Sequence, residues 1–293
     1  MTRDTVTLDN GTLSVEVALR GAELQRLTLN DGRELLWHGD AAFWGGRAPI
    51  LFPIVGKAPD DQVTVGGQGG RMAQHGFARR SDFALESAAP DRCRHVLTDS
   101  PETLAVYPCP FRLVVTHALT GAGLEVTAEV TNTGTAAMPF GLGFHPAFAW
   151  PLPGAAGRGH SITLANGGAP ALARLGDGLL APERLPSPFA DGVLTLDHAL
   201  FGADAMIFPE GAGDALTYAA DAEGAPRLSF RFHNTPNLGI WSKPGAPFVC
   251  IEPWHGMAAR TGAGPEIADR PDSVTLAPGA VARFGWSVTV EGS

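Results

Sequence analysis

The feature that most constrains this chain is a long series of short, strand-like segments bounded by turn residues. Its 293 residues include 37 glycines and 24 prolines, which interrupt apolar runs throughout. The runs are rich in Val, Ile, Leu, Phe and Thr and alternate with polar residues, and no segment sustains the 3.6-residue period of an amphipathic helix. This pattern predicts an all-β protein, a sandwich or a barrel.

Two pairs of these segments should form hairpins. Asn10-Gly11 separates residues 5–8 from 13–19, and a glycine-rich turn at 120–123 separates 111–119 from 124–132. Residues 150–190, rich in Gly, Ala and Pro, are expected to form an irregular surface excursion. Strand-like segments resume after it, so the sequence predicts a single domain over residues 1–293. The other expected strands are 24–29, 83–86, 94–98, 193–196, 205–208, 227–232, 238–241, 248–252 and 281–290.

Composition restricts the partners. The net charge is −9 and no Lys/Arg-rich stripe is present, which argues against nucleic acid or an anionic membrane as the main partner. Neither a signal-peptide core nor a membrane-spanning apolar window occurs in the sequence. Cys93, Cys109 and Cys250 lie far apart without CxxC spacing, which fits reduced thiols in the cytoplasm.

Residues 248–256, FVCIEPWHG, place a carboxylate directly after an apolar run. Pro253 should end ladder pairing, so Glu252 is expected at a strand end, half out of water and beside Trp254. Desolvation there would raise the pKa of the carboxyl group, as a general base for neutral pH requires. The alternative is a glutamate paired with a structural arginine.

Three further polar residues lie in apolar or glycine-rich loops. Arg47, within the apolar segment 41–57, either caps carbonyl groups of a buried loop or offers a hydrogen-bonding fork to a substrate. His75 follows a glycine-rich turn, where a single histidine is usually structural or solvated. His145, flanked by Phe144 and Pro146, is either a core histidine or a neutral imidazole with a partner for each ring nitrogen.

Several common chemistries lack their motifs. No HxxEH or HxxxH spacing is present, so zinc is not expected, and P-loop, dinucleotide and GxSxG fingerprints are missing as well. A glycosidase needs two carboxylates, and Glu252 has only Asp204 as a distant second candidate. One base and one or two neutral acids remain, a set that could move protons on a sugar without a cofactor.

Four motifs occur in an order typical of one known family. They are HGFAR at 75–79, GFHPAF at 143–148, GIWSKP at 239–244 and CIEPW at 250–254, preceded by GAEL at 21–24 and WGGRAPILFPIVGK at 44–57. Over nearly the whole chain the sequence resembles the aldose 1-epimerase, or galactose mutarotase-like, family. Within it, the sequence is most similar to a bacterial branch that includes LacX-like proteins.

The resemblance implies one large antiparallel β-sandwich of the supersandwich type, with a sugar held in an open cleft on one sheet. It implies that Glu252 is the general base that deprotonates the anomeric hydroxyl and that His145 is the general acid that protonates the ring oxygen. The expected partner is a small sugar and no cofactor is implied; the protein would be a monomer or a homodimer. The residues expected to bind substrate are His75, Arg47, Asp204, Trp241 and Arg79.

Three functions stay open. The first is epimerisation of a free hexose, and the second is non-catalytic sugar binding on the same sandwich. The third is epimerisation of a hexose 6-phosphate, because a related branch binds phosphate through a basic cluster. Arginines favour phosphate, although they also bond neutral hydroxyls. The candidates for such a cluster are Arg47, Lys57, Arg79 and Arg80.

Overall fold

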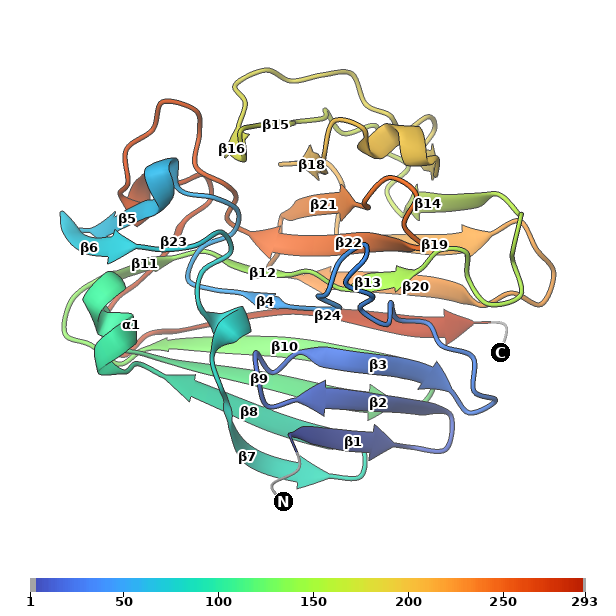
Figure 1. Ribbon diagram of the computed structural model, residues 1–293, viewed down its shortest axis with the longest axis horizontal. Coiled ribbons are helices and arrows are strands. Elements are labelled where there is room, and N and C mark those ends of the chain that lie inside the picture. The colour runs from blue at the N-terminus through green and yellow to red at the C-terminus, as the bar shows by residue number, and fades with distance from the viewer. Residues whose placement is uncertain (1–3, 292–293) are drawn as a thin grey trace.

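The computed structural model describes residues 4–291, which form a β-rich molecule dominated by three antiparallel sheets (Figure 1). The largest sheet has nine strands and extends across the whole molecule. Its strands in spatial order are β17 (Val193–Thr195), β14 (His160–Leu164), β19 (Ala215–Ala220), β20 (Arg227–His233), β24 (Val281–Glu291), β10 (Gly123–Asn132), β9 (Phe111–Thr120), β8 (Arg92–Thr98) and β7 (Ala84–Ala89).

The second sheet has six strands and is built around β22 (Phe248–His255). One edge of β22 pairs with β21 (Asn237–Trp241), which pairs with β18 (Met206–Phe208). The other edge pairs with two short strands in succession, β13 (Ala147–Ala149) and β12 (Leu142–Phe144), and β12 also pairs with β4 (Ile50–Leu51). A long central strand therefore carries a different partner at each end of one edge.

The third sheet is an N-terminal meander of β1 (Thr5–Asp9), β2 (Leu13–Ala18) and β3 (Leu24–Leu29). It lies over the end of the nine-stranded sheet formed by β7 to β10 (Figure 1). Asn10 accepts hydrogen bonds from the backbone of Thr12 and Leu13, and Gly11 has a φ of 80°, so the expected hairpin at Asn10-Gly11 is confirmed.

Small ribbons and short helices complete the chain. The two-stranded ribbons are β5 (Gln62–Val65) with β6 (Gln68–Arg71), β11 (Met138–Phe140) with β23 (Val274–Leu276), and β15 (Leu175–Gly176) with β16 (Leu179–Leu180). The helices are α1 (Pro101–Val106) and the 3₁₀ turns η1 (Pro59–Asp61), η2 (Ala78–Arg80), η3 (His198–Phe201) and η4 (Ile267–Asp269). Within residues 4–291, no helix has the length and apolar content needed to cross a membrane.

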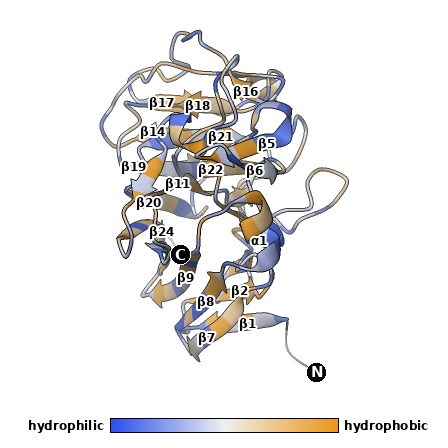
Figure 2. Cartoon of the chain, turned by 90° about the vertical axis from the view of Figure 1, so that its left-hand side faces the viewer, coloured by the Kyte–Doolittle hydropathy of each residue, from blue (hydrophilic) through white to orange (hydrophobic). Residues whose placement is uncertain are grey.

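The core lies between the sheets and follows from the alternation of the strands. The strands of the sheets carry both apolar and polar residues (Figure 2), and β2 buries every second residue, beginning at Leu13. One hydrophobic cluster joins residues of all three large sheets, from Leu8 on β1 through Phe148 on β13 to Val290 on β24. The predicted all-β, antiparallel sandwich is thus confirmed.

The expectation for the end of β22 is wrong. This strand passes through Pro253 and continues to His255, with Pro253 opposite Leu238 of β21. Glu252 therefore lies inside the strand and is 1% exposed, not half out of water at a strand end.

A gap in the neighbouring ladder explains why β22 tolerates a proline. On that edge, β13 pairs with β22 as far as Cys250, and β12 pairs with it only from Trp254 onward. Pro253 lies between these two partners, where no ladder bond on that side needs its missing N–H.

Besides several short strands that the sequence did not predict, three longer elements differ from expectation. Residues 150–190 contain β14, an inner strand of the nine-stranded sheet, so they are not wholly an irregular excursion. Strand β19 and helix α1 were not expected. Helix α1 begins at a capping box in which Ser100 and Thr103 bond each other's backbone N–H, a local signal too short to give a helical period.

Candidate active site

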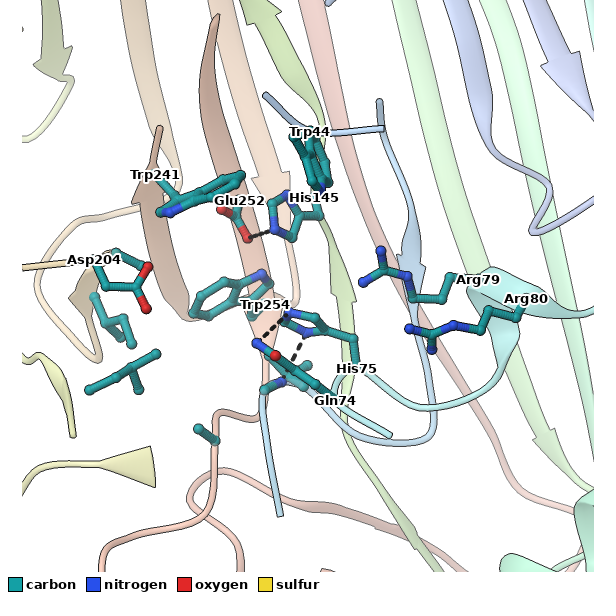
Figure 3. Close-up of a pocket in the computed structure, with 16 residues that line it drawn as sticks. Trp44, Gln74, His75, Arg79, Arg80, His145, Asp204, Trp241, Glu252 and Trp254 are labelled. Atoms are coloured by element: carbon teal, nitrogen blue, oxygen red, sulfur yellow. Dashed lines mark hydrogen bonds and ion pairs between the residues drawn. The ribbon is translucent and has the colours of Figure 1, made fainter. Parts of the chain in front are cut away.

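A cavity of about 430 Å³ opens on the six-stranded sheet (Figure 3). Its floor comes from β22 and β21, and loops that follow β4, β6 and η3 form its walls. It brings together six of the seven site residues expected from the sequence, all except Arg47, and several residues that were not expected. The polar and aromatic lining consists of Trp44, Gln74, His75, Arg79, Arg80, His145, Asp204, Trp241, Glu252 and Trp254.

The gap beside β22 places the His145 side chain next to Glu252. His145 and Pro146 form the link between β12 and β13, and the Pro146 carbonyl accepts a hydrogen bond from the Ile251 N–H. This bond fixes the link alongside β22, next to Glu252. His145 Nε2 consequently lies 3.2 Å from Glu252 Oε2, and the dashed line in Figure 3 marks this contact.

Burial shifts the pKa values of these two groups in opposite directions. Desolvation, with a further contribution from the charge of Asp204, raises the pKa of Glu252 well above its ordinary value. Desolvation, helped by the positive charge of Arg79, lowers the pKa of His145 to about 3. Both shifts disfavour the charged forms, and because the two groups are in contact they titrate as one coupled pair that can share a proton.

His75 is held by backbone geometry beside this pair. Its φ is 68°, and the adjacent Gly76 has a φ of 70° and packs so tightly on the Phe52 carbonyl that a Cβ would overlap it. The Gly56 N–H donates to His75 Nδ1 at 3.0 Å, so in the neutral ring Nε2 carries the hydrogen. The pKa of His75 lies well below its usual value, first because of desolvation and then because of His145 and Arg79, so the ring is a neutral donor.

Three tryptophans enclose the acid–base pair. Trp44 stacks on the His145 ring, with centroids 4.8 Å apart and an angle of 29° between the planes. Trp241 meets the same imidazole edge-on at 5.8 Å. Trp254 lines the floor next to Glu252 (Figure 3). Flat aromatic faces of this kind exclude water and offer apolar surface to a sugar ring.

Charged groups border the cavity. Arg79 and Arg80, on the turn η2, lie on one side in Figure 3, and Asp204 lies on the other. Desolvation, and then the charge of Arg80, lowers the pKa of Arg79, which remains a cation. Within residues 4–291 the Arg79 guanidinium makes no hydrogen bond or ion pair to the protein, so its donors are available to a ligand.

Arg47 lies outside this cavity, contrary to expectation. Its guanidinium donates to the His38 carbonyl at 2.8 Å and to the Gln25 side chain, next to a separate, smaller pocket. Its backbone N–H bonds Glu23. The side chain thus stabilises the apolar loop, which was the other reading of this residue.

Trp44 and Gln74 line the cavity although the sequence did not single them out. Each is close in sequence to a residue that was singled out, Gln74 beside His75 and Trp44 three positions before Arg47. Trp44 could have been predicted from its setting, a large aromatic residue next to two glycines in a loop. Such a side chain does not belong to a strand that would bury it in the core.

The acid–base pair also belongs to a possible donor set for a metal. Ligand atoms of His145, Cys250 and Glu252 lie within 4.8 Å of one another. Two members of this set, His145 and Glu252, already contact each other through Nε2 and Oε2, and burial raises the pKa of the Cys250 thiol, with Glu252 adding to the effect. The arrangement is therefore better suited to proton transfer between the other two groups.

The fold and sequence of this chain have counterparts among known proteins. A sequence model described as aldose 1-epimerase matches residues 4–285, nearly the whole chain. The chain belongs to the aldose 1-epimerase family.

Individual relatives agree with this assignment. The chain is 30% identical to the chromosomal LacX protein of Lactococcus lactis subsp. lactis, with 98% of this chain and 99% of LacX covered. A galactose mutarotase related enzyme from Lactobacillus acidophilus superposes with a TM-score of 0.92 at 30% identity, covering 98% of this chain and 97% of the other. A galactose mutarotase-like protein from Lactobacillus casei gives 0.89 at 32% identity, covering 98% and 100%.

Proposed function

We propose that this protein is an aldose 1-epimerase that interconverts the α and β anomers of a hexose. The observation that carries the proposal is the 3.2 Å contact between His145 Nε2 and Glu252 Oε2 in a cavity of sugar size. Ring opening needs a base at the anomeric hydroxyl and an acid at the ring oxygen. Both oxygens are bonded to the same carbon, so the two protein groups must lie close together.

The reaction would use the proton shared by the pair. With that proton on His145, the Glu252 carboxylate removes the hydrogen of the anomeric hydroxyl, and the imidazolium protonates the ring oxygen. The bond between the anomeric carbon and the ring oxygen breaks, its electrons go to that oxygen, and an aldehyde forms. Rotation about the C1–C2 bond and closure with the roles exchanged give the other anomer.

The remaining residues would bind and orient the sugar. The Nε2–H of His75 and the Arg79 guanidinium are donors to hydroxyl oxygens, and the Asp204 carboxylate is an acceptor. Trp241 and Trp44 would cover the apolar faces of the ring. No step needs a cofactor. Three free, buried cysteines suit a reducing compartment such as the cytoplasm.

Polarimetry tests the proposal. Freshly dissolved α-glucose and α-galactose should reach equilibrium rotation faster with the protein than in buffer alone. A protein that binds these sugars in calorimetry while anomer exchange stays at the buffer rate would contradict catalysis and favour the sugar-binding alternative.

A second candidate substrate is a hexose 6-phosphate, because Arg79 and Arg80 both line the cavity. Paired guanidinium groups favour a phosphate. The 6-phosphate should then bind more tightly than the free hexose, and the preference should weaken as salt is raised.

Arg80→Gln provides the matched test of this candidate, because Arg80 is exposed at the rim and, within residues 4–291, its side chain bonds only the Gly76 carbonyl. The substitution should weaken binding of the 6-phosphate and leave binding of the free hexose unchanged. Equal affinities of the wild type for the two sugars would argue against the phosphate.

A further inference from the structure

A second cluster of chemically reactive side chains lies far from the cavity, on the inner face of the nine-stranded sheet. Cys93 and His95 occupy alternate positions on β8 and therefore point to the same face. His117 on the neighbouring strand β9 lies directly opposite Cys93. One ring nitrogen of each histidine and the Cys93 sulfur lie within 4.8 Å of one another.

The cluster is shielded from solvent. Cys93 and His95 are 0% exposed and His117 is 1% exposed. Strand β1 of the N-terminal sheet packs against both β8 and β9. Cys93 belongs to the main hydrophobic core, together with Leu97, the next inward-facing residue but one on β8. Two imidazoles and a thiol thus share an otherwise apolar compartment.

The imidazoles have few hydrogen-bond partners. Both ring nitrogens of His95 and Nδ1 of His117 are buried without one among the described residues. Buried polar groups are nearly always bonded, and each exception needs an explanation. A neutral imidazole has one nitrogen lone pair, which the missing partners leave free to bind.

We propose that Cys93, His95 and His117 form a buried binding site for a thiophilic transition-metal ion, zinc(II) or copper(I). Two imidazoles and a thiolate are the donor set that these ions prefer. Bonds of about 2.0–2.3 Å bring the ligand atoms to roughly 3.5 Å of one another, which small side-chain rotations achieve. On binding, the Cys93 thiol releases its proton to solvent and the thiolate coordinates the ion.

The sulfur distinguishes this site from a buried water. A water molecule could bond the free imidazole nitrogens, but it gains little from a thiol, which is a weak hydrogen-bonding group. No fourth histidine, cysteine or carboxylate of residues 4–291 belongs to the cluster. Copper(I) would use the three donors as they stand, and zinc(II) would complete its shell with a water molecule.

Metal analysis tests the site on the full chain. Chelator-treated protein is incubated with zinc(II), or with copper(I) under reducing, anaerobic conditions, and is then desalted. Because the site is buried, the ion is offered both to the folded protein and during refolding from urea. The expected result is one ion retained per chain, with cobalt(II) in place of zinc giving a thiolate-to-metal charge-transfer band.

Variants locate the ion. Cys93→Ser should lose the retained ion and the cobalt band, and so should the double variant His95→Leu, His117→Leu, which keeps the compartment apolar and able to fold. The control is His145→Asn, which alters the other donor cluster and should retain the ion. Cys93→Ser should keep the wild-type rate of anomer exchange, which separates this site from the proposed catalytic function.

Two results would overturn the proposal. One is a wild type that retains neither ion under either loading condition, which would favour a buried water. The other is an ion that survives Cys93→Ser but is lost in His145→Asn, which would place it in the catalytic cavity.

Discussion

At the scale of single residues, the candidate catalytic pair depends on burial that disfavours the charged form of both partners. Because the pKa of Glu252 is raised and that of His145 is lowered to about 3, the pair gains a second proton only at very acid pH. The one-proton form, which contains both an acid and a base, should therefore be the working form across the weakly acid and neutral range.

This arrangement predicts an unusual pH–rate profile. On the acid side the catalysed rate should stay level down to about pH 5, because the second proton binds His145 only near pH 3, and it should fall on the alkaline side once the shared proton is lost. Polarimetry after subtraction of the buffer rate gives the profile, and circular dichroism checks folding at each pH. A fall centred near pH 6.5, where an ordinary imidazole titrates, would show that the histidine is not desolvated as described.

The unpartnered nitrogens of His95 lead to a prediction for stability. Without metal, His95→Leu should raise the free energy of unfolding by about 1 kcal/mol, because a buried polar group without a partner costs about 1–3 kcal/mol. Urea denaturation of metal-free protein measures the change. His233→Leu, on the exposed side of β20, is the control and should change stability by less than about 0.5 kcal/mol. A loss of stability in His95→Leu would mean that the ring has partners in solution.

At the scale of elements, the floor of the cavity depends on two glycines on the strands that flank β22. Gly143 of β12 lies opposite Trp254, and Gly239 of β21 lies diagonally across from it. A Cβ at Gly239 would come within 2.5 Å of the Trp254 ring, and one at Gly143 within 2.6 Å. The indole can lie flat on the sheet only because both neighbours lack a side chain.

Gly239→Ala should therefore displace Trp254. The expected loss of stability is about 1–3 kcal/mol, the usual effect of overpacking, and the rate of anomer exchange should fall in the variant that remains folded. Gly264→Ala is the control, because Gly264 has open space around it. Urea denaturation and polarimetry measure the two effects. An unchanged rate and stability in Gly239→Ala would contradict the account of the floor.

Local patterns could predict most strands, but not the features that depend on distant partners. The hairpins at Asn10-Gly11 and residues 120–123 are encoded by adjacent residues, and the structure has both. The burial of Glu252 depends on the gap between the pairings of β12 and β13 with β22. These two strands lie about a hundred positions earlier in the chain. The residues around Pro253 do not indicate that gap. The sequence therefore predicts that Pro253 ends the strand, whereas β22 continues to His255.

The candidate site shows the same limit. The motifs around His75, His145 and Glu252 could be linked only through their resemblance to a family, since they are far apart in sequence. The position of Trp44 and the hydrogen bonds from Arg47 to Gln25 and His38 depend on how one loop folds. No periodic pattern specifies such a loop.

At the scale of the whole molecule, one hydrophobic cluster connects the three large sheets. We therefore expect the chain to unfold as one cooperative unit. Far-ultraviolet circular dichroism, which follows the nine-stranded sheet, and tryptophan fluorescence, which follows mainly the cavity, should give coincident thermal transitions. Two separated transitions would show that the N-terminal meander or the six-stranded sheet unfolds independently.

The most direct test of the central claim is polarimetry of a fresh α-hexose with the wild type and Glu252→Gln side by side. The sugar is the one whose equilibration the wild type accelerates, and circular dichroism verifies that the variant is folded. Glutamine keeps the shape but cannot accept the proton, so acceleration should fall by about 10²–10⁴-fold, towards the buffer rate. A folded Glu252→Gln protein that equilibrates the sugar as fast as the wild type would contradict the assignment of Glu252 as the base.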